Sequence, residues 1–214
     1  MRKEFRYIEE LFQRRPELIT TASALKDAFD LMEECFLNAG KILICGNGGS
    51  AADSSHIAGE LIKSFMKERK LPLKISEFLS SVDTERGYSL ASSLQGSLPA
   101  LALSTDSSVM SAVSNDIGGD LIFAQQIVGL GRPGDLLIGI STSGNAENVI
   151  NAALISSAAG MKVIGLTGRT GGELASFCDV LIAVPADTTH EVQELHLPVY
   201  HTLCAMVEDC FFNN

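Results

Sequence analysis

The feature that most constrains the fold is a joint that occurs twice, in which a short apolar run leads through a loop of small residues into a helix. The first run, residues 41–45 (KILIC), precedes the loop 46–50, and the second, residues 135–140 (DLLIGI), precedes the loop 141–145. Such runs are typical of strands buried on both faces. Strands that alternate with helices pair in parallel. The sequence therefore predicts an α/β fold with a three-layer, doubly wound parallel sheet.

The rest of the chain fits one domain spanning residues 1–214. Helices are predicted over residues 3–15, 21–39, 51–67, 108–115, 121–130, 146–159 and 191–212. Further strands are predicted over residues 98–104, 162–166 and 180–184. The helices before residue 40 are additions at the N-terminus. Pro72, Gly87 and many serines interrupt the stretch of about 70–97, where we expect an irregular insertion with at most one short helix.

Composition excludes several classes of function. The chain has 16 Lys and Arg against 26 Asp and Glu, a formal net charge of −10, whereas nucleic-acid or membrane-surface binding needs a basic face. No apolar run approaches the ~18 residues of a membrane span, and the first residues contain no apolar signal core. The five cysteines form no CxxC pair, which indicates reduced thiols. We expect a cytoplasmic protein without nucleic-acid or membrane partners.

Both loops are suited to a phosphate. Gly48 and Gly49 let the backbone approach a ligand, and a helix N-terminus attracts an anion. Hydroxyl groups that can bind phosphate oxygens belong to Ser50, Ser141, Thr142 and Ser143. One such loop is equally consistent with an ordinary turn and a capping serine, but two on one sheet favour a ligand. Neither matches GxGxxG or GxxxxGK(S/T), which argues against a dinucleotide or a P-loop nucleotide.

Candidates for acid–base or metal chemistry come from the histidines. His56 and Glu60 are four residues apart on a predicted helix and share a face, so they can transfer a proton or bind a divalent metal. Taken alone, they fit a solvated helix face better, and His196 and His201 fit half-buried imidazoles. Gln193 and His201 are eight residues apart on the terminal helix, ~12 Å along its axis.

Longer segments carry a more specific signal. In chain order they are GNGGSAADSSHIAGEL (46–61), LSTDSSVMSAVSND (103–116), GDLLIGISTSGNAENV (134–149), GMKVIGLTG (160–168), GGEL (171–174) and VQELHLPVYH (192–201). By these segments the chain resembles the SIS (sugar isomerase) domain family, and more closely its phosphoheptose isomerases. NGGSAAD followed by HIAGE is specific within SIS proteins, whereas STSGN marks only the wider superfamily.

The resemblance implies a five-stranded parallel sheet flanked by helices. It implies a homotetramer with active sites near subunit interfaces. The implied activity is isomerisation of sedoheptulose 7-phosphate to D-glycero-D-manno-heptose 7-phosphate through an enediol. That product would feed heptose into bacterial surface glycans such as lipopolysaccharide.

The resemblance also implies roles for residues. Glu60 would be the catalytic base and His201 its partner acid/base. The phosphate would lie on Gly48, Gly49, Ser50, Ser141, Thr142 and Ser143. The sugar would face Asn47, Asp116 and Gln193. One zinc ion per subunit would have the ligands His56, Glu60, Gln193 and His201. The ~12 Å from Gln193 to His201 leaves two arrangements open, a bent helix start or a site shared between chains.

Three departures from the family pattern bear on the substrate. Ala146 replaces a serine that often follows STSGN, and Ser64 replaces an arginine usual four residues after the glutamate. The stretch 70–97 is longer than usual by roughly two dozen residues, as expected for a lid, an oligomer contact or a surface excursion without a role.

Three functions remain open on the sequence alone. The first is a phosphoheptose isomerase, and the second is an isomerase of another ketose phosphate. The third is a non-catalytic SIS regulator of the replication-initiation type, which binds a phosphosugar without turnover. Regulators of that kind tend to lack the glutamate and the terminal-helix histidine, so Glu60 and His201 favour an enzyme.

Overall fold

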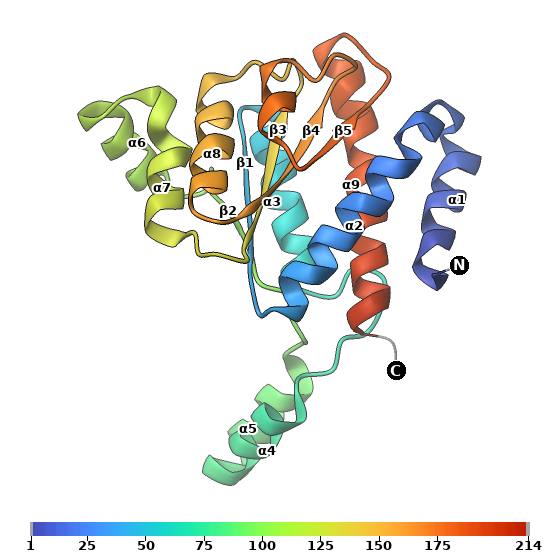
Figure 1. Ribbon diagram of the computed structural model, residues 1–214. Helices are drawn as coiled ribbons and strands as arrows, with labels where there is room; N and C mark the ends of the chain where they lie inside the picture. The colour runs from blue at the N-terminus through green and yellow to red at the C-terminus, as the bar shows by residue number, and fades with distance from the viewer. Residues whose placement is uncertain (1, 213–214) are drawn as a thin grey trace.

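Five apolar segments pair in parallel to form the central sheet of the computed structural model, which describes residues 2–212 (Figure 1). The strands are β1 (Ile42–Gly46), β2 (Ala100–Ala102), β3 (Leu136–Ser141), β4 (Lys162–Thr167) and β5 (Val180–Ala183). Their order is β2-β1-β3-β4-β5, so the winding direction reverses between β1 and β3. Every residue of β1 and β3 is buried, as expected for strands covered on both faces. The predicted fold class is confirmed.

Helices cover both faces of the sheet. One face carries α1 (Arg6–Arg14), α2 (Ala22–Leu37), α3 (Gly49–Ile62) and α9 (Thr189–Phe211). The other carries α6 (Ser107–Asp116), α7 (Ile122–Leu130) and α8 (Glu147–Ala158). Short 3-10 helices are η1 (Lys3–Phe5), η2 (Pro16–Thr21), η3 (Gly119–Leu121) and η4 (Glu173–Phe177). Neighbouring residues of β1, Leu43 and Ile44, point into the two different cores. No helix within residues 2–212 has the length and hydrophobicity that a bilayer crossing requires.

The helix predicted over residues 51–67 ends early because a buried carboxylate accepts hydrogen bonds from the backbone of the residues that follow it. α3 stops at Ile62. The backbone N–H groups of residues 65–67 then donate to the carboxylate of Glu208 on α9, over 2.7–3.1 Å. Glu208 lies 146 residues after Ile62 in the sequence, so the helix propensity of the α3 segment does not reveal this contact.

Arg69 completes this arrangement, which we call the Glu208 clamp (residues 65–69 with Glu208). Its Nε donates to Glu208 at 2.7 Å, and both side chains are only 1% exposed. Its two other nitrogens donate to the carbonyl oxygens of Leu61 and Glu60, at 2.6 and 2.7 Å. The clamp therefore caps the last turn of α3 and ties it to α9.

The insertion at residues 70–97 is helical rather than irregular. Two helices, α4 (Leu73–Val82) and α5 (Thr84–Ser93), pack on each other as a hairpin that projects from the body (Figure 1). A Cβ at Gly87 would lie 2.0 Å from the carbonyl oxygen of Leu79, so the close approach of the two helices requires glycine. Gly87, which in the sequence suggests a helix break, is therefore the residue at which the two helices of the hairpin touch.

Replacing Arg69 with methionine should lower the free energy of unfolding by ~3–5 kcal/mol, because Glu208 would remain buried without its cationic partner. Denaturant titration measures the change. The matched control, Arg15→Met, removes an exposed ion pair with Glu17 and should change the free energy by less than ~1 kcal/mol. Equally small effects of the two substitutions would contradict a structural role for the clamp.

Candidate active site

The carboxyl ends of β1 and β3 enclose an open pocket of about 320 Å³. The two loops and the start of α9 line it, with Asn47, Gly48, Gly49, Ser50, Ile140, Ser141, Thr142, Ser143, Ala146, Thr189 and Gln193. Ligands of parallel sheets bind where the strand order reverses, which is between β1 and β3 here. The pocket brings together all the predicted phosphate residues, along with Asn47 and Gln193.

This pocket is suited to an anion although the chain is acidic. None of its lining residues is Asp, Glu, Lys or Arg. α3 and α8 both begin at its edge, and the positive ends of their dipoles favour a negative ligand. The Ser143 hydroxyl accepts a hydrogen bond from the Asn145 N–H at 3.1 Å, which leaves its own hydrogen to donate.

Two contacts shape the polar rim of the pocket. A Cβ at Gly49 would lie 2.4 Å from Nε2 of Gln193, so only glycine at this position leaves room for the Gln193 side-chain amide. Asn47 and Asn148 exchange amide hydrogen bonds of 2.8 and 3.0 Å, which join the first loop to the start of α8. Sequence reasoning missed Asn148 and Thr189. The available signal for Asn148 was its place in the first turn of the helix that follows the second loop.

His56, further along α3, lies between Glu60 and His201. Its Nε2 is 3.1 Å from Oε1 of Glu60 and 3.4 Å from Nε2 of His201. α3 and α9 run side by side in the same direction, because Gly49 meets Gln193 and, further on, His56 meets His201. The structure thus brings three of the four predicted metal ligands together, including the predicted catalytic pair.

Two predicted residues lie apart from this cluster. Gln193 is inside α9, which begins at Thr189 and runs on through Pro198 to His201, so the eight residues between them correspond to ~12 Å of helix rise and Gln193 does not precede the helix. Asp116 is the exposed last residue of α6 and accepts a hydrogen bond from Nδ2 of Asn115 at 2.7 Å. It does not line the pocket of this chain.

Tyr200 and Asp53, which sequence reasoning missed, orient His56. The Tyr200 hydroxyl donates to Oδ1 of Asp53 at 3.2 Å and lies 3.0 Å from Nδ1 of His56. Burial raises the pKa of Asp53, and burial together with Asp53 raises the pKa of Tyr200. Because the hydroxyl has one proton to donate, Nδ1 of His56 supplies the hydrogen of the second contact. Nε2 then keeps its lone pair toward Glu60 and His201.

His201 is a neutral base at pH 7. Burial, followed by the neighbouring His56, lowers its pKa from the ordinary value for histidine. The ring of Phe65 lies 5.3 Å from the ring of His201, and Nζ of Lys63 is 3.3 Å from Oε2 of Glu60. A carboxylate beside a neutral imidazole is an arrangement that can move protons on a bound substrate.

The donor atoms fit a zinc ion in chemical type. Tetrahedral zinc with bonds of ~2.0–2.1 Å places neighbouring donors ~3.3 Å apart, and the two contacts of His56 measure 3.1 and 3.4 Å. Within residues 2–212, however, no three His, Cys, Asp or Glu side chains form a ready metal-binding group. His56, Glu60 and His201 therefore supply suitable ligands without a completed coordination shell.

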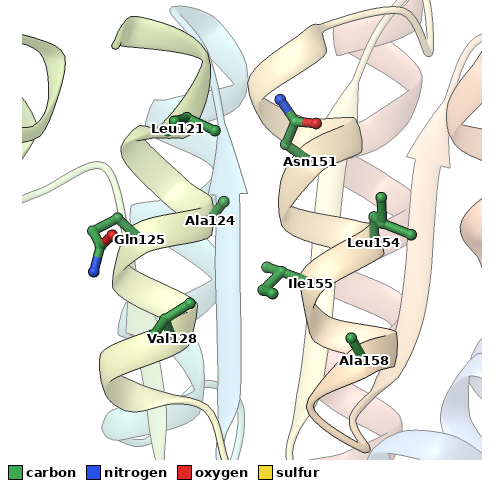
Figure 2. Close-up of a pocket in the computed structure, with 8 residues that line it drawn as sticks. All are labelled: Leu121, Ala124, Gln125, Val128, Asn151, Leu154, Ile155 and Ala158. Atoms are coloured by element: carbon green, nitrogen blue, oxygen red, sulfur yellow. The ribbon is translucent and has the colours of Figure 1, made fainter. Parts of the chain in front are cut away.

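A second pocket, of about 330 Å³, lies between α7 and α8 (Figure 2). Leu121, Ala124 and Val128 of one wall face Leu154, Ile155 and Ala158 of the other. The only polar side chains among its lining residues are Gln125 and Asn151. With no titratable group in its lining, this groove offers no acid–base chemistry.

Known proteins match the chain over most of its length. The SIS domain family matches residues 6–94 and 84–168. A phosphoheptose isomerase from a Nitratiruptor species is 43% identical over 178 residues, 83% of this chain and 81% of the relative. One from Aliarcobacter butzleri is 39% identical over 97% of this chain and 95% of its own. The solved structure of phosphoheptose isomerase from Neisseria gonorrhoeae is 36% identical, with a TM-score of 0.71 over 97% of this chain and 94% of that one.

The chain belongs to the phosphoheptose isomerase family of SIS-domain proteins. This confirms the family inferred from the sequence segments. The relatives compared carry the name of the enzyme rather than of a regulator. In this member of the family, the two stretches matched by the SIS domain overlap over residues 84–94, within and just beyond α5.

His196, one turn after Gln193 on α9, should make stability fall in acid. It is fully buried, and burial lowers its pKa to about 4. Unfolding restores the ordinary histidine pKa near 6.5, so the unfolded chain binds more protons than the folded one between the two pKa values. Up to ~3 kcal/mol of stability should therefore be lost as pH falls from about 6.5 to about 4. Denaturant titration across this range should show a shallower pH dependence for His196→Leu. The exposed-site control, His190→Gln, should keep the slope of the wild type, and an unchanged slope in His196→Leu would refute the assignment.

Proposed function

We propose that this protein is an aldose–ketose isomerase that converts sedoheptulose 7-phosphate to D-glycero-D-manno-heptose 7-phosphate through an enediol. The observation that carries the proposal is the contact of both Glu60 and His201 with His56, on two adjacent helices beside an anion-binding pocket. The names of its relatives support the same reaction. The product would supply heptose for bacterial surface glycans such as lipopolysaccharide, in the cytoplasm.

The phosphate end of the substrate would bind in the pocket between β1 and β3. Hydroxyls of Ser50, Ser141, Thr142 and Ser143 would donate to its oxygens. The helix N-termini would supply the compensating positive potential, since no lysine or arginine lines the pocket. Ala146 offers no hydroxyl there, so the four named side chains carry this contact. Asn47 and Gln193 would face the sugar, and Asp116 lies too far outside the pocket lining to be assigned from a single chain.

The chemical step transfers a proton between two adjacent carbons. Glu60, as a carboxylate, would take the proton from the carbon next to the carbonyl group and return it to the neighbouring carbon. Neutral His201 would accept and donate the hydroxyl proton as the enediol forms and collapses. Tyr200 and Asp53 would hold His56 in one tautomer and orientation beside this pair.

A zinc ion is the proposed cofactor, one for each active site. His56, Glu60 and His201 would hold it, with Gln193 as the fourth ligand. When bound, zinc would polarise the substrate carbonyl and stabilise the negative charge of the enediolate. His56 is the ligand whose second ring nitrogen is oriented by a neighbour, which is the usual arrangement for a metal-bound histidine.

Distances along α3 support a site shared between copies of the chain. Ser50 and Glu60 are ten residues apart on this helix, ~15 Å along its axis. From ordinary bond lengths, an extended seven-carbon sugar phosphate spans only roughly 10 Å from phosphorus to the first carbon. Gln193 is likewise displaced from His201. We infer a homotetramer in which one copy supplies the phosphate pocket and Gln193, and another supplies His56, Glu60 and His201.

Purified protein should isomerise sedoheptulose 7-phosphate, while Glu60→Gln and His201→Ala should each lose at least ~100-fold in kcat, the usual scale for general acid–base groups. Chelator should lower the activity of the wild type, and added zinc should restore it. The exposed control Glu191→Gln should behave as wild type. Phosphosugar binding without turnover under all conditions would refute the enzyme.

Co-expression of two inactive variants tests the shared site. Thr142→Val damages the phosphate pocket and Glu60→Gln damages the acid–base cluster. If different chains supply these parts, a mixed assembly contains some sites with neither substitution and regains part of the wild-type activity, up to about a quarter of the sites for random pairing. Mixing Glu60→Gln with His201→Ala, which lie in one cluster, should restore nothing. Failure of the first mixture with proven co-assembly would assign each site to a single chain.

A further inference from the structure

The hairpin of α4 and α5 is the part of this chain that its own fold leaves uncovered. Within residues 2–212 the two helices pack on each other and on no other helix or strand to a comparable extent. No residue of α4 is buried, and Gly87 is the sole buried residue of α5. Each helix has ten residues, and isolated helices below ~12–15 residues are marginal in water. A hairpin of this kind needs a covering surface.

The uncovered surface is strongly apolar. Seven large apolar side chains of the hairpin are 40–72% exposed, namely Leu73, Ile75, Phe78, Val82, Tyr88, Leu90 and Leu94. Ile75, Phe78 and Val82 follow the i, i+3, i+7 spacing of a single stripe on α4. Taking ~200 Å² for each whole side chain, their exposed fractions amount to roughly 800 Å². The stripe of Ile75, Phe78 and Val82 alone accounts for roughly 370 Å² of this sum, comparable with the largest apolar patch of a typical monomer, ~300–600 Å², which is often functional.

The distribution of charge along the hairpin favours a second copy of the chain as the partner. The whole chain has a net charge of −10, but residues 70–95 contain three basic and three acidic side chains. Lys70 and Lys74 lie at the base, and the tip between the helices carries Asp83, Glu85 and Arg86, with net charge −1. Two hairpins in antiparallel contact would set the basic base of one against the acidic tip of the other. Elsewhere, the excess of acidic residues disfavours self-association.

We propose that the α4–α5 hairpin is a dimerisation arm, which pairs with the same hairpin of a second copy through its apolar stripe about a two-fold axis. Such an interface is isologous, so Phe78 and Val82 meet the stripe of the partner and the base-to-tip charges match twice. The inference concerns assembly alone and does not depend on the proposed reaction.

Light scattering after size-exclusion chromatography tests the arm with two independent variants. Phe78→Glu with Val82→Glu places charge on the stripe, and its matched control, Ser80→Glu with Ser81→Glu, adds equal charge to exposed positions of the same helix. The second variant replaces residues 72–93 with an Asn-Gly turn. Lys70 and Gln95 pair in an antiparallel bridge, so a two-residue turn can close the gap without disturbing the body.

The stripe variant and the excised protein should both have half the wild-type mass or less at micromolar concentration, while the serine control keeps the wild-type mass. Far-UV circular dichroism and cooperative thermal unfolding would show that the body remains folded. A wild-type monomer, or an unchanged mass in both variants, overturns the proposal. A wild-type monomer that floats with phosphatidylcholine and phosphatidylglycerol vesicles would identify the hairpin as a membrane contact instead.

Discussion

The carboxylate of Glu208 is the interaction on which the active end of this molecule depends. Removed from water, it is stabilised by three backbone N–H groups and by Arg69, so its charge is fully hydrogen-bonded. Arg69 in turn holds the carbonyl groups of the last turn of α3, the turn that carries Glu60. Glu208 lies two turns beyond His201 on α9. One ionic contact thus sets the position of α3 on α9, and the hairpin leaves the body where this contact ends.

The sheet sets a second constraint, because it determines where an anion can bind. Reversal of the winding between β1 and β3 opens a crevice at which two helices begin. Backbone dipoles and hydroxyls provide the positive potential there, so the pocket needs no lysine or arginine. This explains how a chain with net charge −10 can serve a phosphorylated substrate without attracting polyanions over its whole surface.

The sequence was sufficient to predict the features that depend on local patterns. It was not sufficient where a residue far away in the sequence determines the local structure. The buried strands, both glycine loops and the face shared by His56 and Glu60 follow from periodicity and spacing, and the structure has them. Helix rise alone also predicted ~12 Å along the axis between Gln193 and His201, and both residues lie in α9. The early end of α3 was not predictable, since the group that terminates it is 146 residues after Ile62. The hairpin was missed because glycine lowers helix propensity in general, whereas Gly87 is required by a neighbouring helix.

The hydrogen bonds around His56 determine what its Nε2 can bind. Tyr200 donates its one proton to Asp53, so the Nδ1–H of His56 donates to the tyrosine oxygen, and its Nε2 presents a lone pair. That lone pair meets the Glu60 carboxylate at 3.1 Å and the ring of His201, whose imidazole burial keeps neutral. Lone pairs at such distances repel unless a positive charge lies between them. The repulsion between these lone pairs favours a cation at this point, which can be a proton or a metal ion. With Nδ1–H held by Tyr200 in this half-buried network, His56 has the tautomer in which Nε2 can accept a proton or bind a cation.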